Sequence, residues 1–207
     1  MSVHLVARNY YFVKRLHSLL GIVPLSVFLL EHLMVNSLST VGSREFNAAA
    51  GVLASIPYLI AVELGLIIIP LLLHGLLGLW IVYQGSVETR VPYLRNWLYL
   101  LQRGTGVIVF IFVLYHLYAT RFQHLLHPEQ DLYALMAGYV ANPLLFAFYL
   151  VGVACASFHL GNGLFNFTYK WGIAVSESAQ TWAMVIGLLI GVLFFAIGLG
   201  ALLGFVA

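Results

Sequence analysis

Four histidines lie inside four successive apolar stretches of the chain. They are His32, His74, His116 and His159, separated by 42, 42 and 43 residues. An ionisable side chain within hydrocarbon costs free energy and generally serves a function. Imidazole is a common ligand of iron, and almost no carboxylate or thiol accompanies these residues. The pattern therefore predicts two haems, each held by two histidines.

The composition requires that these histidines lie in membrane helices. The chain has 207 residues, of which 62% are hydrophobic and 8% charged, and its mean hydropathy is +0.99. These values are far from those of soluble domains. A transmembrane helix needs about 20 apolar residues, and five stretches qualify, at 17–38, 58–84, 98–120, 143–169 and 182–206. We expect an all-α polytopic protein, a single membrane domain over 1–207, whose first four helices form an antiparallel haem-binding bundle.

Two absences narrow the class of cofactor. The single Cys155 excludes both a disulfide framework and a cysteine-ligated iron–sulfur cluster. The sequence has no C-x-x-C-H motif, so each haem is expected to be a b haem, without thioether bonds. The first apolar stretch is too long for a signal peptide and lacks an A-x-A-like cleavage site, which predicts a retained helix.

The basic residues predict the orientation. Five helices place seven basic residues on the side of the N-terminus and two on the other side, a bias that predicts a cytoplasmic N-terminus and an outer C-terminus. The larger group comprises Arg8, Lys14, Arg15, Arg90, Arg95, Arg103 and Lys170, and the smaller one comprises Arg44 and Arg121. The polar stretch 121–142 is expected to lie along the outer surface.

This orientation sorts the histidines by depth. At 1.5 Å per residue, His32 lies about 25 Å and His116 about 20 Å from the inner edge, whereas His74 and His159 each lie about 15 Å from it. The outer pair joins the first and third helices and the inner pair the second and fourth, as diagonal members of a four-helix bundle would. The alternative is that the histidines are polar contacts between helices, bonded to one another or to the backbone.

Several polar residues share the inner level. Lys170 follows His159 by about three turns on the same face, where it is expected to pair with a haem propionate; the alternative is a lysine that extends to the interface. Further candidates for propionate contacts, or for a docking surface, lie on the first and third helices: Arg15, His17, Ser18, Tyr99, Gln102 and Arg103.

Two acids are candidates for proton exchange with a quinone. Glu63 precedes His74 by about three turns and therefore lies near the depth of the outer haem. Glu31 is adjacent to His32, on a different face of its helix, and is the second candidate. A carboxyl group at this depth can exchange protons with a bound quinone. The alternative for each is a hydrogen-bonded structural acid.

The fifth helix has no ionisable residue between 182 and 206. It carries two pairs of glycines four residues apart, Gly187 with Gly191 and Gly200 with Gly204. Such pairs allow helices to approach closely. We expect this helix to serve packing, within the chain or against a neighbour, and not electron transfer.

Three strings carry a resemblance to a known family. R-L-H-S-L-L-G at 15–21, Y-L-R-N-W-L-Y-L-L-Q-R-G-T-G at 93–106, and F-H-L-G-N-G-L-F at 158–165 followed by K-W-G resemble the di-haem cytochrome b membrane anchors of succinate:menaquinone oxidoreductases and fumarate reductases. The resemblance is closest to the Bacillus-type anchors, and it covers all five helices and all four histidines.

The resemblance implies haems with two histidine ligands, menaquinone as substrate, and a flavoprotein and an iron–sulfur subunit on the cytoplasmic side of a bacterial membrane. It places Lys170 at an inner-haem propionate, with His17, Ser18, Tyr99 and Gln102 nearby. One departure is Ser157, where a di-haem fumarate reductase has a glutamate that relays protons. No confident alignment places a relative's quinone-site glutamate on Glu63.

The chain itself cannot carry out succinate chemistry, because it has neither a flavin-binding G-x-G-x-x-G motif nor a cysteine cluster. The sequence therefore predicts a membrane anchor that transfers electrons between an iron–sulfur subunit and menaquinone. Nucleic acid is not expected among its partners. The alternatives are a fumarate reductase anchor working in reverse, the cytochrome b of another membrane oxidoreductase, and a transporter with histidine proton relays.

Overall fold

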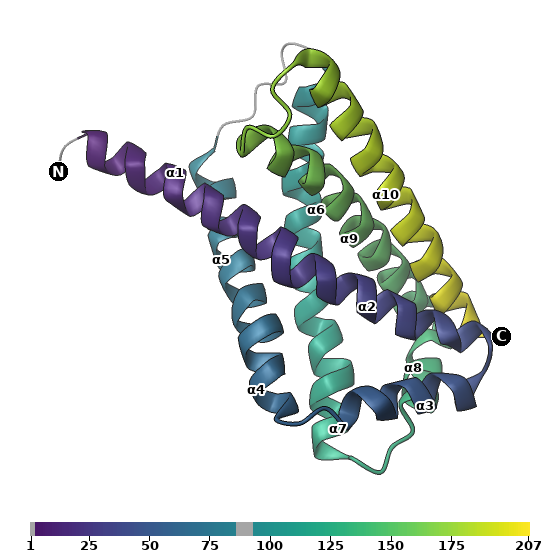
Figure 1. Ribbon diagram of the computed structural model, residues 1–207. Coiled ribbons are helices and arrows are strands. Elements are labelled where there is room, and N and C mark those ends of the chain that lie inside the picture. The colour runs from purple at the N-terminus through teal and green to yellow at the C-terminus, as the bar shows by residue number, and fades with distance from the viewer. Residues whose placement is uncertain (1–2, 86–92) are drawn as a thin grey trace.

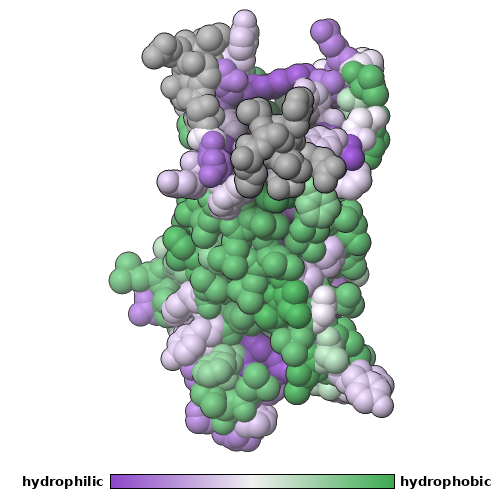
Figure 2. Space-filling model, turned by 90° about the vertical axis from the view of Figure 1, so that its left-hand side faces the viewer, coloured by the Kyte–Doolittle hydropathy of each residue, from purple (hydrophilic) through white to green (hydrophobic). Residues whose placement is uncertain are grey.

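The computed structural model describes residues 3–85 and 93–207, with side chains from Tyr10 onward. These residues form helices and no strand. Five helical segments are long and apolar enough to cross a membrane: Tyr10–Thr40, Leu59–Gln84, Leu94–Leu126, Pro143–Lys170 and Glu177–Gly204. The all-α class and the five spans are thereby confirmed. Figure 2 shows the corresponding apolar band between two polar ends.

The first span is long and interrupted. It comprises α1 (Val3–Leu20), the π-helical turn η1 (Gly21–Leu25), α2 (Ser26–Ser37) and the short η2 (Leu38–Thr40). Pro24 lies within η1, where its missing N–H breaks the α-helical hydrogen-bond pattern. The Ser26 hydroxyl donates to the Gly21 carbonyl at 2.8 Å. α1 begins well before residue 17, and its N-terminal part projects away from the other helices (Figure 1).

The second and third spans also contain π-helical turns. The second consists of α4 (Leu59–Glu63), η3 (Leu64–Ile68) and α5 (Ile69–Gln84), and the third of α6 (Leu94–Leu117), η4 (Tyr118–Phe122) and α7 (Gln123–Leu126). The residues between the second and third spans, including Arg90, lie outside the described part of the chain, and the side chain of Arg8 does so as well.

Two short helices lie across one end of the bundle (Figure 1). They are α3 (Ser43–Ala54), which the sequence analysis did not predict, and α8 (Leu132–Val140), within the stretch expected on the outer surface. α3 packs against α8. Asp131 caps α8 by accepting from the Ala134 N–H at 2.9 Å.

The first four spans form a closed ring in chain order. α1 packs against α5, α5 against α6, α6 against α9 (Pro143–Lys170), and α9 against α1 and η1. The first and third spans are therefore diagonal, as are the second and fourth. α10 (Glu177–Gly204) lies outside this ring, against α9 and α2. We call the end of the bundle where α5 and α9 end and α6 begins the inner end, following the orientation expected from the charges.

Glycines allow α9 and α10 to touch along their backbones. A Cβ atom on Gly191 would lie 2.9 Å from the Ser157 carbonyl oxygen, and one on Gly161 only 3.0 Å from the Gly191 Cα. The expected packing role of Gly187 and Gly191 is thus found within the chain. Gly204 packs against Ser39, whereas Gly200 has no atom within 4 Å of a built Cβ.

Candidate haem-binding site

The structure brings the four histidines together in the two pairs expected from their depth. The His74 and His159 rings have centroids 6.1 Å apart with planes at 89°, and the His32 and His116 rings have centroids 5.7 Å apart with planes at 80°. Two imidazoles that bind one metal ion from opposite sides, each through a bond of about 2 Å, have ring centroids about 6 Å apart. Both separations fit a single iron between each pair.

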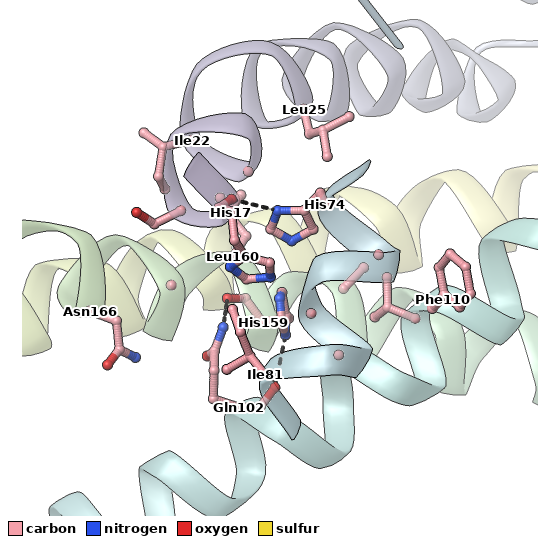
Figure 3. Close-up of a pocket in the computed structure, with 18 of the residues that line it drawn as sticks. His17, Ile22, Leu25, His74, Ile81, Gln102, Phe110, His159, Leu160 and Asn166 are labelled. Carbon is pink, nitrogen blue, oxygen red and sulfur yellow. Dashed lines mark hydrogen bonds between the residues drawn. The ribbon is translucent and has the colours of Figure 1, made fainter. Parts of the chain in front are cut away.

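The two histidines of the inner pair also make the hydrogen bonds that are typical of metal-binding histidines. His74 Nδ1 donates to the His17 carbonyl at 2.8 Å, and His159 Nδ1 donates to the Gln102 carbonyl at 3.1 Å (Figure 3). Metal-binding histidines commonly donate their second ring N–H to a carbonyl in this way, which fixes the tautomer and the ring orientation. In the neutral imidazole, a proton held at Nδ1 leaves Nε2 free to bind iron.

Each inner ring lies against a glycine of the neighbouring helix. A Cβ on Gly21 would come within 2.6 Å of His74 Cε1, and one on Gly106 within 2.8 Å of His159 Cε1. Any side chain at these positions would displace the rings, so the glycines are required by close approach.

A cavity of about 280 Å³ adjoins the inner pair and is mostly apolar. Its lining includes His17, His74 and His159 (Figure 3). The described lining residues also include three cations, Lys14, Arg103 and Lys170, and no aspartate or glutamate. Uncompensated cations favour a ligand that carries negative charge, as a haem does through its propionates. The residues present at the inner site therefore fit a haem.

The predicted inner-level residues lie around this cavity but differ in what they contact. The Arg103 guanidinium lies 4.2 Å above the Tyr99 ring. Ser18 Oγ accepts from the Trp171 indole N–H at 3.1 Å, and Arg15 lies 4.8 Å above the same Trp171 ring. Aromatic faces thus hold both guanidinium groups in place.

His17 is closer to the histidine pair than expected. Its ring stacks on that of His74 with centroids 4.0 Å apart, and its carbonyl accepts the His74 Nδ1–H. His17 therefore positions His74 through the backbone, in addition to its place in the cavity wall.

Gln102 lines the cavity, where the sequence predicted surroundings of a propionate, and its side-chain amide also bonds neighbouring residues. Gln102 Nε2 donates to the His159 carbonyl at 3.0 Å, and Gln102 Oε1 accepts from Asn162 Nδ2 at 2.7 Å. Each end of the amide thus makes one hydrogen bond within the protein. Sequence spacing placed Gln102 at the right level but could not show the direction of its side chain.

The outer pair lies in a more aromatic environment. The Phe112 ring stacks on His116, with centroids 5.7 Å apart, and the Tyr149 hydroxyl lies 3.4 Å from His116 Nδ1. His32 Nε2 lies 3.4 Å from the Asn36 amide nitrogen. No backbone carbonyl is bonded to either ring among the described residues, so the outer pair fits a haem less completely than the inner pair.

The two candidate acids have different surroundings. Glu63 Oε2 accepts from Arg121 Nε at 3.1 Å and from Arg121 Nη2 at 2.7 Å, and both side chains are about one-quarter exposed. Charge counting had assigned Arg121 only to the outer side, so this ion pair was missed. Glu31 has one buried carboxyl oxygen without a hydrogen-bond partner among the described residues.

Comparison with known proteins identifies the family to which the chain belongs. Residues 88–199 match the succinate dehydrogenase/fumarate reductase transmembrane subunit family. The succinate dehydrogenase cytochrome b558 subunit of Bacillus subtilis (strain 168) is 38% identical to the chain over 200 residues, which are 96% of this chain and 98% of that protein. The chain belongs to this family.

Membership of the succinate dehydrogenase/fumarate reductase transmembrane subunits confirms the resemblance and the membrane-anchor role expected from the sequence. It excludes the transporter and the cytochromes b of unrelated oxidoreductases. Three residues around the site were not predicted from the sequence: Lys14 lines the cavity, Asn162 bonds Gln102, and Trp171 bonds Ser18. Asn162 had a detectable signal, because it is a polar residue in an apolar segment three positions after His159.

Proposed function

We propose that this transmembrane subunit binds two b haems and conducts electrons across the membrane. His74 and His159 would hold the iron of the inner haem, and His32 and His116 would hold the iron of the outer haem. The observation that carries the proposal is the inner pair, whose rings are about 6 Å apart and both donate Nδ1–H to backbone carbonyls. The haems supply reversible one-electron transfer.

The inner-end cations hold the inner haem in this proposal. Lys170, Lys14 and Arg103 line the cavity without an acid among the described lining residues, and they pair with the propionates. Tyr99 supports Arg103 through its ring face, and Ser18 supports Trp171 through its hydroxyl. The His17 carbonyl fixes the His74 tautomer.

The electron donor at the inner end is an iron–sulfur subunit, which receives electrons from a flavoprotein that oxidises succinate. Both partners lie on the cytoplasmic side, where the positive-inside rule places the inner end. The basic side chains Lys14, Arg15 and Lys170 line a second hollow at this end and provide a polar surface for docking. The N-terminus is then cytoplasmic and the C-terminus outside.

The acceptor is menaquinone, bound near the outer haem. Glu63 exchanges protons with it, and Arg121 holds the carboxylate in position through two hydrogen bonds. Glu31, with an unpartnered buried oxygen, is the second candidate. Ser157 is buried at the contact between α9 and α10, which supports its role in packing and not in proton transfer. The alternative is the reverse reaction, in which the subunit serves a fumarate reductase.

The test of this function is a haem assay on the purified protein. Pyridine haemochrome analysis should give about two b haems per chain, the number expected from four axial histidines. In the complete complex, succinate should reduce both haems without destroying either of them. A haem-to-chain ratio near zero contradicts the proposal.

A further inference from the structure

Asn162 is the least exposed polar side chain in the described residues, at 1%. Its Nδ2 group donates to Gln102 Oε1 at 2.7 Å and to the Leu98 carbonyl at 3.1 Å. Its Oδ1 atom has no hydrogen-bond partner among those residues. Burial of an incompletely paired amide costs free energy. Stability alone therefore does not explain an asparagine at this position.

Gln102 connects Asn162 to His159 by hydrogen bonds in both directions. Gln102 Nε2 donates to the His159 carbonyl at 3.0 Å, while His159 Nδ1 donates to the Gln102 carbonyl at 3.1 Å. The carbonyl that fixes the imidazole thus belongs to the residue whose side chain grips the backbone of that histidine. Because Asn162 holds the other end of the Gln102 amide, the three residues form one connected network.

The opposite side of α9 is fixed at the same level. A Cβ on Gly161, next to Asn162, would lie 2.5 Å from the Gly187 carbonyl oxygen of α10. Helix α9 is therefore held between the amide network on α6 and the backbone of α10. A helix held on both sides cannot rotate about its axis without breaking one of these contacts.

We propose that Asn162 and Gln102 are positioning residues that set the orientation of the His159 ring toward the iron of the inner haem. This inference rests on the proposed function, since it requires that His159 binds a haem. Replacement of the hydrogen-bond partners of metal-binding histidines typically changes metal affinity or activity by about 10- to 100-fold. The hydrogen bonds that orient His159 run from the Gln102 carbonyl through the side-chain amides of Gln102 and Asn162.

A role as simple contacts between helices makes a different prediction. Interhelical hydrogen bonds of side chains also stabilise membrane proteins. In that role, loss of the amides would lower thermal stability but leave the spectrum and retention of the inner haem unchanged. A positioning role requires that the inner haem alone changes.

The experiment uses the complete complex with Asn162→Leu, which keeps a similar volume, and Gln102→Met as a second apolar replacement in case the first does not accumulate. Thr168→Val is the matched control, because Thr168 lies on the same helix and its hydroxyl bonds only the Phe165 carbonyl. Haem transfer to apomyoglobin measures retention, and electron paramagnetic resonance of the low-spin signals reports the ring orientation.

We expect loss of the inner haem to be about 10-fold faster in both amide variants, with a displaced low-spin signal for that haem and an unchanged outer haem. Thr168→Val should match the wild type. Suppose that the wild type carries two haems. Unchanged retention of the inner haem and an unchanged low-spin signal in both Asn162→Leu and Gln102→Met would then overturn this inference alone. A wild type without haem would overturn the proposed function, and this inference with it.

Discussion

Backbone carbonyls, and not carboxylates, orient the inner histidines. His74 and His159 each donate Nδ1–H to a carbonyl of a neighbouring helix. This arrangement avoids a buried acid beside the haem, which would be costly in hydrocarbon. The charges at the site are instead the cations Lys14, Arg103 and Lys170, which suit the two carboxylates that a haem brings with it.

At the outer end, Glu63→Gln tests proton exchange with menaquinone. Loss of a proton-transferring group typically lowers a rate by about 100-fold or more, so menaquinone reduction by the complex should fall by that factor. Both haems and succinate oxidation with an artificial acceptor should remain. Glu129→Gln is the matched control, because Glu129 is an exposed outer acid. If menaquinone reduction survives in Glu63→Gln, the Glu63–Arg121 ion pair is only structural.

Helix contacts show what the sequence could and could not predict. The five spans follow from their apolar length, and the pairing of the histidines follows from helical rise. α3 was missed because it has no apolar run of membrane-spanning length and lies across one end of the bundle. The side-chain direction of Gln102 depends on α9, and the partner of Glu63 depends on η4, so neither could be found from spacing within one helix.

The contact between α9 and α10 depends on glycine at one position but not at another. Gly191→Leu should lower stability by about 1–3 kcal/mol, because its Cβ would lie 2.9 Å from the Ser157 backbone oxygen. Gly200→Leu is the matched control on the same helix, since nothing lies within 4 Å of its Cβ. Thermal unfolding in detergent measures the difference. Equal melting temperatures for the two variants would contradict the observed packing.

The cap of α8 predicts a pH dependence. Hydrogen bonds from the Ala134 N–H and the Asn47 amide hold the pKa of the Asp131 carboxyl below its usual value. The cap therefore stabilises α8 fully above the ordinary pKa of aspartate, about 3.9, and this contribution is lost as the pH falls through the lowered value.

Asp131→Ala removes the cap at any pH. It should cost about 1 kcal/mol locally, which corresponds to about fivefold faster amide exchange in α8 at neutral pH. Hydrogen exchange measured by mass spectrometry tests this, with the α10 amides as the internal reference. No acceleration in α8 would show that the observed Asp131 hydrogen bonds do not stabilise the helix.

At the scale of the whole molecule, the proposed function makes the two histidine pairs a path for electrons from the inner to the outer end. Electrons that follow it from a cytoplasmic donor move toward the positive side of the membrane. One charge crossing 100 mV changes the free energy by about 2.3 kcal/mol, a factor of about 50 in an equilibrium constant. Succinate oxidation by menaquinone is unfavourable, so a potential of this sign assists it.

Energised vesicles that contain the complex provide the test of this coupling. Collapse of the membrane potential with an ionophore should lower succinate-driven menaquinone reduction and should not affect reduction of a water-soluble acceptor on the inner side. Equal inhibition of both reactions would contradict electron transfer across the membrane. Stimulation of menaquinone reduction would show that electrons move toward the negative side, opposite to the proposed sidedness.

The pairing of histidines across the diagonals of the bundle is the central claim, and redox-titrated difference spectra of the four single alanine variants test it most directly. His74→Ala and His159→Ala should both lose the inner-haem component, and His32→Ala and His116→Ala should both lose the other component. Each variant should retain about one haem per chain, as expected when one of two sites loses an axial ligand. Loss of the same spectral component in His74→Ala and His32→Ala would contradict the pairing.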